Sequence, residues 1–146
     1  MDKNRNNTDL LNQSEIKLLP NNSVNNNDNI NKIVTLFIFL QTTMKIYHWN
    51  TKSYPRHKAS DEFIEKFSSN VDKFVEVFMG RYNITLNINN IEIGQQIDDS
   101  NVFELLERCR KSLEDFTCCI KDSELLNIRD EMLGDINQTL YLFRLR

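Results

Sequence analysis

The sequence predicts an all-α protein, a four-helix bundle preceded by a disordered, Asn-rich N-terminal tail. The 146-residue chain has only 3 glycines and 2 prolines, which is too few for a turn-rich β-sandwich. Apolar residues recur at three- and four-residue steps in four separate segments, and this is the period of an α-helix face. A chain of this length usually forms one domain with a sizeable core.

The predicted tail covers residues 1–29, and the predicted bundle domain covers residues 30–146. Eleven of the first 31 residues are Asn, and a segment of this composition has too little apolar surface to fold by itself. The positive and negative charges of the tail balance, so the sequence does not support DNA binding through a cationic tail.

The first two predicted helices span about residues 31–49 and 56–79. The turn-like sequence at 50–55 joins them, and Pro55 suits the first turn of the second helix. Gly80 is the predicted C-cap of that helix.

The last two predicted helices span about residues 101–121 and 123–145. The cluster Asp-Asp-Ser-Asn at 98–101 predicts the N-cap of the third helix. Residues 81–99 alternate only loosely between apolar and polar side chains, and we expect them to form a long connection. Four amphipathic helices in this order fit a four-helix bundle.

The second predicted helix has an apolar face and a charged face. On a helical wheel the core face carries Phe63, Phe67, Val71, Phe74 and Phe78. A stripe on another side of the helix carries His57, Asp61, Glu65, Asp72 and Glu76.

This stripe contains candidate metal ligands, together with the second of the two histidines in the chain, His48. His57 and Asp61 are four residues apart, as are Asp72 and Glu76, so each pair can converge on one ion. Imidazole and carboxylate ligands together suit Fe(II), with Mn(II) and Zn(II) as alternatives. The competing interpretation is a solvated helix face, which is the usual meaning of a charged stripe.

Helix geometry decides how the two pairs could share a metal ion. Asp61 and Asp72 are eleven residues apart, or about 16 Å along the helix axis, so one ion cannot contact both. Each pair would therefore be half of a site. A two-fold dimer with antiparallel second helices would complete two equivalent sites, with the axis near Lys66 and Phe67.

The pattern HWN…H-x3-D-x10-D-x3-E resembles the Dps miniferritins, ferritin-like proteins that oxidise iron at a dimer interface. The resemblance covers residues about 40–80. The segment DEMLGDINQTLYLFRL at 130–145 looks like the last helix of an uncharacterised ferritin-like family of large DNA viruses. The resemblance implies a ferritin-like four-helix bundle.

The resemblance also implies a ligand set, in which the last two residues come from the partner chain: His48, His57, Asp61, Asp72 and Glu76. Trp49 matches the aromatic residue beside the Dps site. The segment between His48 and His57 is shorter than in Dps, and the last helix has no Glu-x-x-His motif, so an ordinary ferritin site inside one bundle is not expected.

The implied function is binding of iron and its oxidation by peroxide or oxygen, which protects against oxidative damage. The implied partner is a second copy of the chain, and Dps dimers can in turn build a dodecamer. Two alternatives stay open: a catalytically silent structural or virion-associated protein, and a dimer that a metal ion only staples together.

We expect an intracellular, cytoplasmic protein with no membrane partner, or, from the viral resemblance, a component of a virion or of the infected cell. The longest apolar run, at 33–40, is too short to span a bilayer, and no signal peptide is recognisable. The three cysteines do not indicate a disulfide framework.

Overall fold

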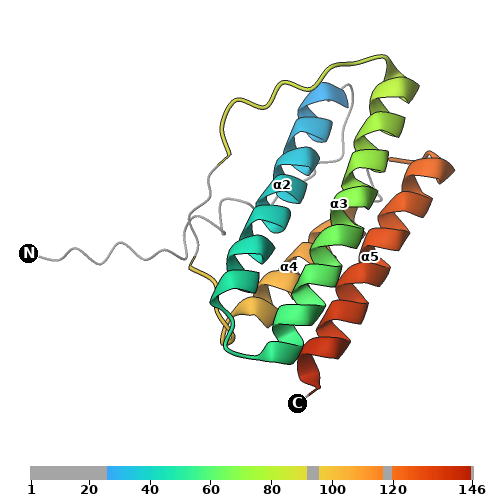
Figure 1. The fold of residues 1–146 in the computed structure, drawn as a ribbon. Coiled ribbons are helices and arrows are strands. Elements are labelled where there is room, and N and C mark those ends of the chain that lie inside the picture. Colours follow the sequence, from blue (N-terminus) through green and yellow to red (C-terminus); the bar gives the residue numbers. More distant parts are fainter. Residues whose placement is uncertain (1–25, 92–95, 117–119, 146) are drawn as a thin grey trace, which may run out of the picture.

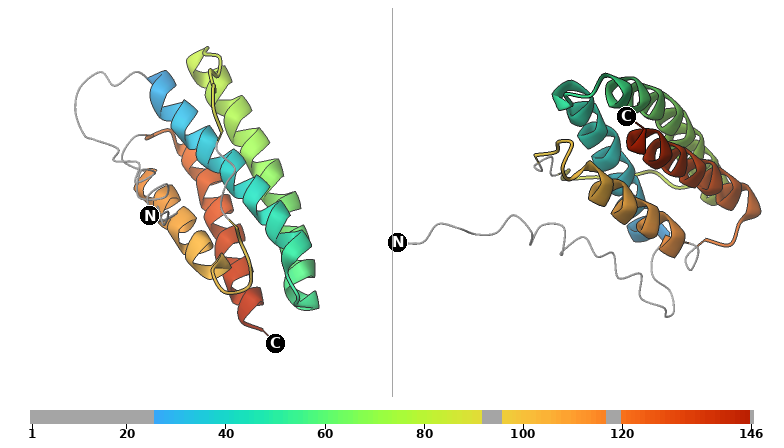
Figure 2. Two further views of the ribbon diagram at one scale, coloured as in Figure 1. Left: turned by 90° about the vertical axis from the view of Figure 1, so that its left-hand side faces the viewer. Right: turned by 90° about the horizontal axis from the view of Figure 1, so that it is seen from below.

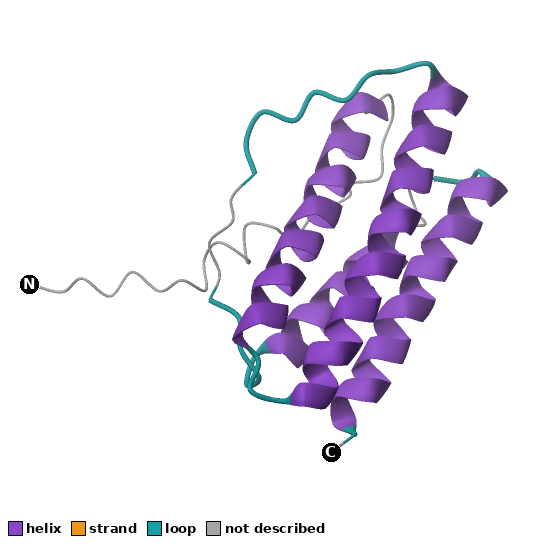
Figure 3. Ribbon diagram, in the orientation of Figure 1, coloured by secondary structure: helices purple, strands orange, loops and turns teal. Residues whose placement is uncertain are grey.

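The computed structural model describes residues 26–91, 96–116 and 120–145, and within them the fold is all-α (Figures 1 and 3). The helices are α2 (Asn26–Asn50), α3 (Tyr54–Tyr82), α4 (Val102–Asp115) and α5 (Ser123–Arg144). The predicted all-α four-helix bundle is confirmed. Most of the predicted tail, residues 1–25, lies outside the described residues, but residues 26–29 are helical and belong to α2. None of the described helices is long and apolar enough to cross a bilayer.

The helices follow each other with one long crossover (Figure 1). A short turn joins α2 to the antiparallel α3, and α4 likewise runs antiparallel to α5. Between these two hairpins, residues 83–91 leave the end of α3 and residues 96–101 lead into α4 at the opposite end of the bundle, so α4 points in the same direction as α3. A single long crossover is one of the known connectivities of four-helix bundles.

The helices pack around one shared core, and the right-hand view of Figure 2 shows their arrangement from below. α3 packs against both α2 and α5, and α4 packs against α5 and, over a smaller area, α2. All five apolar positions predicted for the core face of α3 are buried. The ring of Phe74 lies 5.5 Å from the rings of both Phe37 and Phe116, so it connects three parts of the bundle.

The end of α3 differs from the prediction. The helix continues past Gly80 to Tyr82, and the C-cap is Asn83, which adopts the left-handed conformation that Asn tolerates (φ 49°, ψ 51°). Tyr82 stabilises this extra half-turn because its ring packs against Phe78 and its hydroxyl donates to the carboxylate of Asp122 at the start of α5. The residues that follow, 84–91, form an extended connection, and the side chains of Ile84, Leu86 and Ile88 pack against the core.

The limits of α4 also differ from the prediction. The helix ends at Asp115 and does not reach Lys121. Asp122 has an extended backbone and accepts the first hydrogen bonds of α5 through its carbonyl, so the chain must leave the helix before this residue. Asn101 occupies the predicted N-cap position, but its side chain makes no capping hydrogen bond.

Candidate metal site

The two histidines meet where α2 turns into α3. His48 lies in the last turn of α2, and His57 lies in the first turn of α3, which Ser53 caps through a hydrogen bond from the backbone N–H of Arg56. The two imidazole rings stack, with their centroids 3.9 Å apart and their planes 23° from parallel. We call His48 and His57 the histidine pair.

Each histidine is hydrogen-bonded to the backbone of the other. His48 Nδ1 lies 3.0 Å from the carbonyl oxygen of His57, and His57 Nδ1 lies 2.9 Å from the carbonyl oxygen of His48. Ser60 supports this arrangement, because its hydroxyl donates to the His57 carbonyl and lies 3.2 Å from His48 Nδ1.

These contacts define the tautomer of both rings. A carbonyl oxygen only accepts hydrogen bonds, so both Nδ1 atoms must carry the hydrogen. In the neutral rings the lone pair is then on Nε2, the atom that can bind a metal ion. Metal-binding histidines commonly donate their other ring N–H to a backbone carbonyl in this way, which fixes the orientation of the ring.

Asp61 is the carboxylate nearest to the histidine pair. Its Oδ1 lies 3.9 Å from His48 Nε2, and it also lies 3.7 Å from Nζ of Lys45 on α2. Within the described residues, no group of three or more His, Cys, Asp or Glu side chains is arranged to hold a metal ion.

The other two predicted ligands, Asp72 and Glu76, lie further along α3 and are not brought to the histidine pair. Both are exposed, as the helical wheel predicted, and neither makes a hydrogen bond or an ion pair within the described residues. The predicted near-site aromatic, Trp49, directly follows His48 but is 69% exposed.

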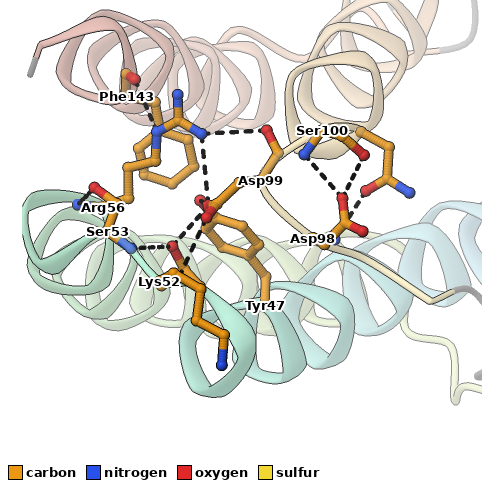
Figure 4. A network of polar contacts seen from close by, with 10 residues as sticks. Tyr47, Lys52, Ser53, Arg56, Asp98, Asp99, Ser100 and Phe143 are labelled. Atoms are coloured by element: carbon orange, nitrogen blue, oxygen red, sulfur yellow. Dashed lines mark hydrogen bonds and ion pairs between the residues drawn. The ribbon is translucent and has the colours of Figure 1, made fainter.

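A polar network beside the histidine pair was not predicted from the sequence (Figure 4). The carboxylate of Asp99 accepts hydrogen bonds from the hydroxyls of Tyr47 and Thr51, both at 2.7 Å, and from the backbone N–H of Lys52 at 3.2 Å. Arg56 donates to the backbone carbonyl of Asp99 at 3.2 Å and lies 3.5 Å from its carboxylate. We call these five residues the Asp99 network.

The network has a clear electrostatic effect on two of its members. Burial alone would raise the pKa of Asp99, but the hydrogen bonds from Thr51, Tyr47 and Lys52 outweigh it and hold this pKa below its usual value. Burial raises the pKa of Tyr47 to about 12. At neutral pH Asp99 is therefore a carboxylate and Tyr47 a neutral donor.

The sequence contains only weak signals for these additional residues. Asp99 belongs to the cluster at 98–101, whose composition predicts helix capping, but its side chain points to the α2–α3 turn and not to α4. Lys45 lies one helical turn before His48, a spacing that places it near the histidine but does not identify Asp61 as its partner.

A shallow groove between α3 and α5 is a separate feature of the surface. Its volume is about 690 Å³, and Glu62, Glu65, Glu131 and Asp135 contribute acidic side chains to it. Several of these acids already have partners in the chain: Lys66 donates to Glu62, Asn70 donates to Asp135, and Lys73 lies 3.9 Å from Glu131. Burial raises the pKa of Asp135.

The fold and the site together define a helical bundle that combines a hydrogen-bonded histidine pair with an acidic stripe on one helix. Residues 48–143 match the model of a family of unknown function (DUF5856), and the chain belongs to this family. The matched segment contains all five candidate ligands. Comparison with curated proteins and with solved structures gives no match.

Proposed function

We propose that this protein is a Dps-like iron-binding protein that oxidises Fe(II) at sites shared between two copies of the chain. The two contacts between Nδ1 of one histidine and the backbone carbonyl of the other are the observation that carries the proposal. Both rings hold their Nδ1–H on a backbone carbonyl, which leaves Nε2 to bind a metal ion, and His48 Nε2 is close to the carboxylate of Asp61.

The carboxylates of Asp72 and Glu76 support a site that a second copy completes. They have no partner within the described residues, and Asp72 lies about 16 Å along α3 from Asp61. An antiparallel pairing of α3 with its symmetry mate would bring these carboxylates to the histidine pair of the partner, once on each side of the two-fold axis.

The composition of α2 supports the same dimer. Ile38, Phe39 and Ile46 are only partly buried, although the opposite side of the helix already fills the core. Ile38 and Trp49 are seven residues before and four residues after Lys45, so they share the edge of α2 that contacts α3 at Asp61. A second copy on this edge would cover Ile38 and Trp49, the apolar side chains of α2 on the side of Lys45.

The ligand set suits the proposed reaction with iron as the substrate. Neutral imidazole accepts Fe(II), and carboxylates favour the harder Fe(III) product. With peroxide as the oxidant, two Fe(II) ions each give up one electron, the O–O bond breaks, and two protons are taken up to leave two molecules of water. The residues of the chain would bind and orient the ions, and the carboxylates would offset the added positive charge.

The test is iron binding followed by oxidation. The full-length protein is titrated with Fe(II) without oxygen, peroxide is then added, and ferric absorbance is followed over time. We expect faster oxidation than in buffer, and loss of both binding and acceleration in His57→Ala/Asp61→Ala. The matched control, Glu104→Ala/Arg108→Ala, changes an ion pair at the same spacing on α4, with Glu104 exposed and Arg108 half-buried, and should bind and oxidise Fe(II) like the unmodified protein. No binding of Fe(II) and no acceleration by the unmodified protein would reject the proposal.

The contact between Lys45 and Asp61 leads to a second prediction, a small change in the affinity for Fe(II). The ammonium group competes with a metal ion for the carboxylate, so Lys45→Gln should tighten Fe(II) binding by up to about fivefold, the value of an exposed ion pair. Binding is measured by anaerobic titration. Lys73→Gln, which removes a comparable exposed pair with Glu131, should leave the affinity unchanged. Weaker binding by Lys45→Gln would mean that Lys45 supports the site.

The same contact favours a second candidate function, a structural protein that has kept the bundle and has no iron chemistry. In this case Lys45 neutralises Asp61 permanently, and no metal ion is needed. A third possibility is a dimer that a bound metal ion stabilises without any oxidation of iron. A chelator would then lower the melting temperature while peroxide and Fe(II) react no faster than in buffer.

A further inference from the structure

The Asp99 network is built around the two chain neighbours of the histidine pair. Tyr47 directly precedes His48, and Arg56 directly precedes His57. The hydroxyl of Tyr47 and the guanidinium of Arg56 both bind Asp99, which belongs to the crossover and not to the α2–α3 hairpin. Asp99 therefore ties the two ends of the turn to a third segment of the chain (Figure 4).

The turn itself is held by the same side chain. Thr51 and Lys52 lie between the two histidines, and both donate to the carboxylate of Asp99. Arg56 also donates to the carbonyl of Phe143 at 3.0 Å, so the end of α5 contributes to the position of the turn. The guanidinium lies over the ring of Phe103, which limits its movement further.

The geometry of the histidine pair depends on this turn. Each imidazole binds the backbone carbonyl of the other histidine, so a small change in the path of the chain between them moves both acceptors. Both acceptors are backbone atoms in the helix turns that flank residues 51–53, so their separation depends on the path of these residues.

We propose that Asp99 is a positioning residue for the histidine pair: it holds the α2–α3 turn so that both rings keep Nδ1–H on a carbonyl and leave Nε2 free. The effect of Asp99 on the tautomer of the two rings does not need a metal ion and can be measured in the metal-free protein. Its effect on the affinity for Fe(II) rests on the proposed function.

The test uses the full-length chain without metal. Because the protein has only two histidines, a long-range ¹H–¹⁵N spectrum reports the tautomer of each ring without ambiguity. We expect both rings of the unmodified protein to carry hydrogen on Nδ1. In Asp99→Ala, we expect a mixture in which the Nε2–H tautomer, the one that free histidine prefers, is substantially populated.

Asp122 offers a matched control at the other end of the bundle. Its carboxylate also accepts from a tyrosine, Tyr82, and from an arginine, Arg81. Asp122→Ala should therefore disturb a comparable network while leaving the spectrum of the histidine pair unchanged. The proposal is overturned if Asp99→Ala keeps both rings as Nδ1–H with unchanged shifts, or if Asp122→Ala changes the tautomers to the same extent.

A milder variant covers the case in which Asp99→Ala does not fold. Tyr47→Phe/Thr51→Val removes both hydroxyl donors of the Asp99 network and nearly preserves both side-chain shapes. We expect a partial shift towards Nε2–H, and an unchanged spectrum would overturn the proposal.

Metal titration separates this proposal from the proposed function. If the chain binds Fe(II), Asp99→Ala should weaken binding about 10-fold, the lower end of the effect of losing a direct outer partner of a metal ligand, because Asp99 acts on the rings only through the turn. If the unmodified protein binds no Fe(II), the iron proposal fails, while the tautomer measurement still decides the role of Asp99.

Discussion

Two inactive variants should regain iron oxidation when they share one dimer. In His57→Ala/Asp61→Ala the histidine half of the site is removed, and in Asp72→Asn/Glu76→Gln the carboxylate half is removed. In a mixed dimer one site carries both defects and the other carries none. Random mixing would therefore restore about a quarter of the sites, since half of the dimers are mixed and each has one intact site out of two.

This experiment needs co-expression with two different affinity tags, followed by isolation of the mixed dimers, in which half of the sites should be intact. Oxidation of Fe(II) by peroxide is then measured at equal protein concentration. The control is each variant co-expressed with a differently tagged copy of itself, which should remain inactive. Mixed dimers without activity would contradict a shared site, and so would full activity of Asp72→Asn/Glu76→Gln by itself.

The largest expected effect on stability comes from Phe74→Ala. Phe74 is fully buried, and its ring contacts Phe37 on α2 and Phe116 at the end of α4. Its removal would leave a cavity between three segments and should lower the free energy of unfolding by about 3–5 kcal/mol. Urea denaturation followed by circular dichroism measures this change.

Tyr141→Ala is the matched control for an aromatic side chain. Tyr141 is 60% exposed on α5, so its truncation should change the free energy of unfolding by no more than about 0.5 kcal/mol. Equal losses in Phe74→Ala and Tyr141→Ala would mean that the centre of the bundle is not packed as described.

The fold could be predicted to a large extent because local patterns determine it. The spacing of Phe63, Phe67, Phe74 and Phe78 predicts the buried face of α3, and all four are in the core. The ends of helices were predicted less well. Gly80 is a good helix terminator by residue type, but the contacts of Tyr82 with a residue 40 positions away extend α3 beyond it.

The candidate site could be predicted only in part, because some of its contacts join residues that are far apart in the sequence. Helical spacing alone predicts that Asp61, Asp72 and Glu76 share one exposed side of α3. The partner of Asp61 on α2 and the role of Asp99 depend on how segments that are distant in sequence pack together. No local pattern contains this information. The completion of the site by a second copy remains a prediction.

The crossover between the two hairpins has a consequence for the order of folding. The histidine pair joins residues nine positions apart, so it can form while only the α2–α3 hairpin exists. The contacts of Asp99 with Tyr47 and Arg56 close loops of 52 and 43 residues, and they need the second half of the chain to be docked. Because long loops close at a greater entropic cost, we expect an early hairpin whose imidazoles are paired but loosely held, and a late step in which the turn becomes rigid.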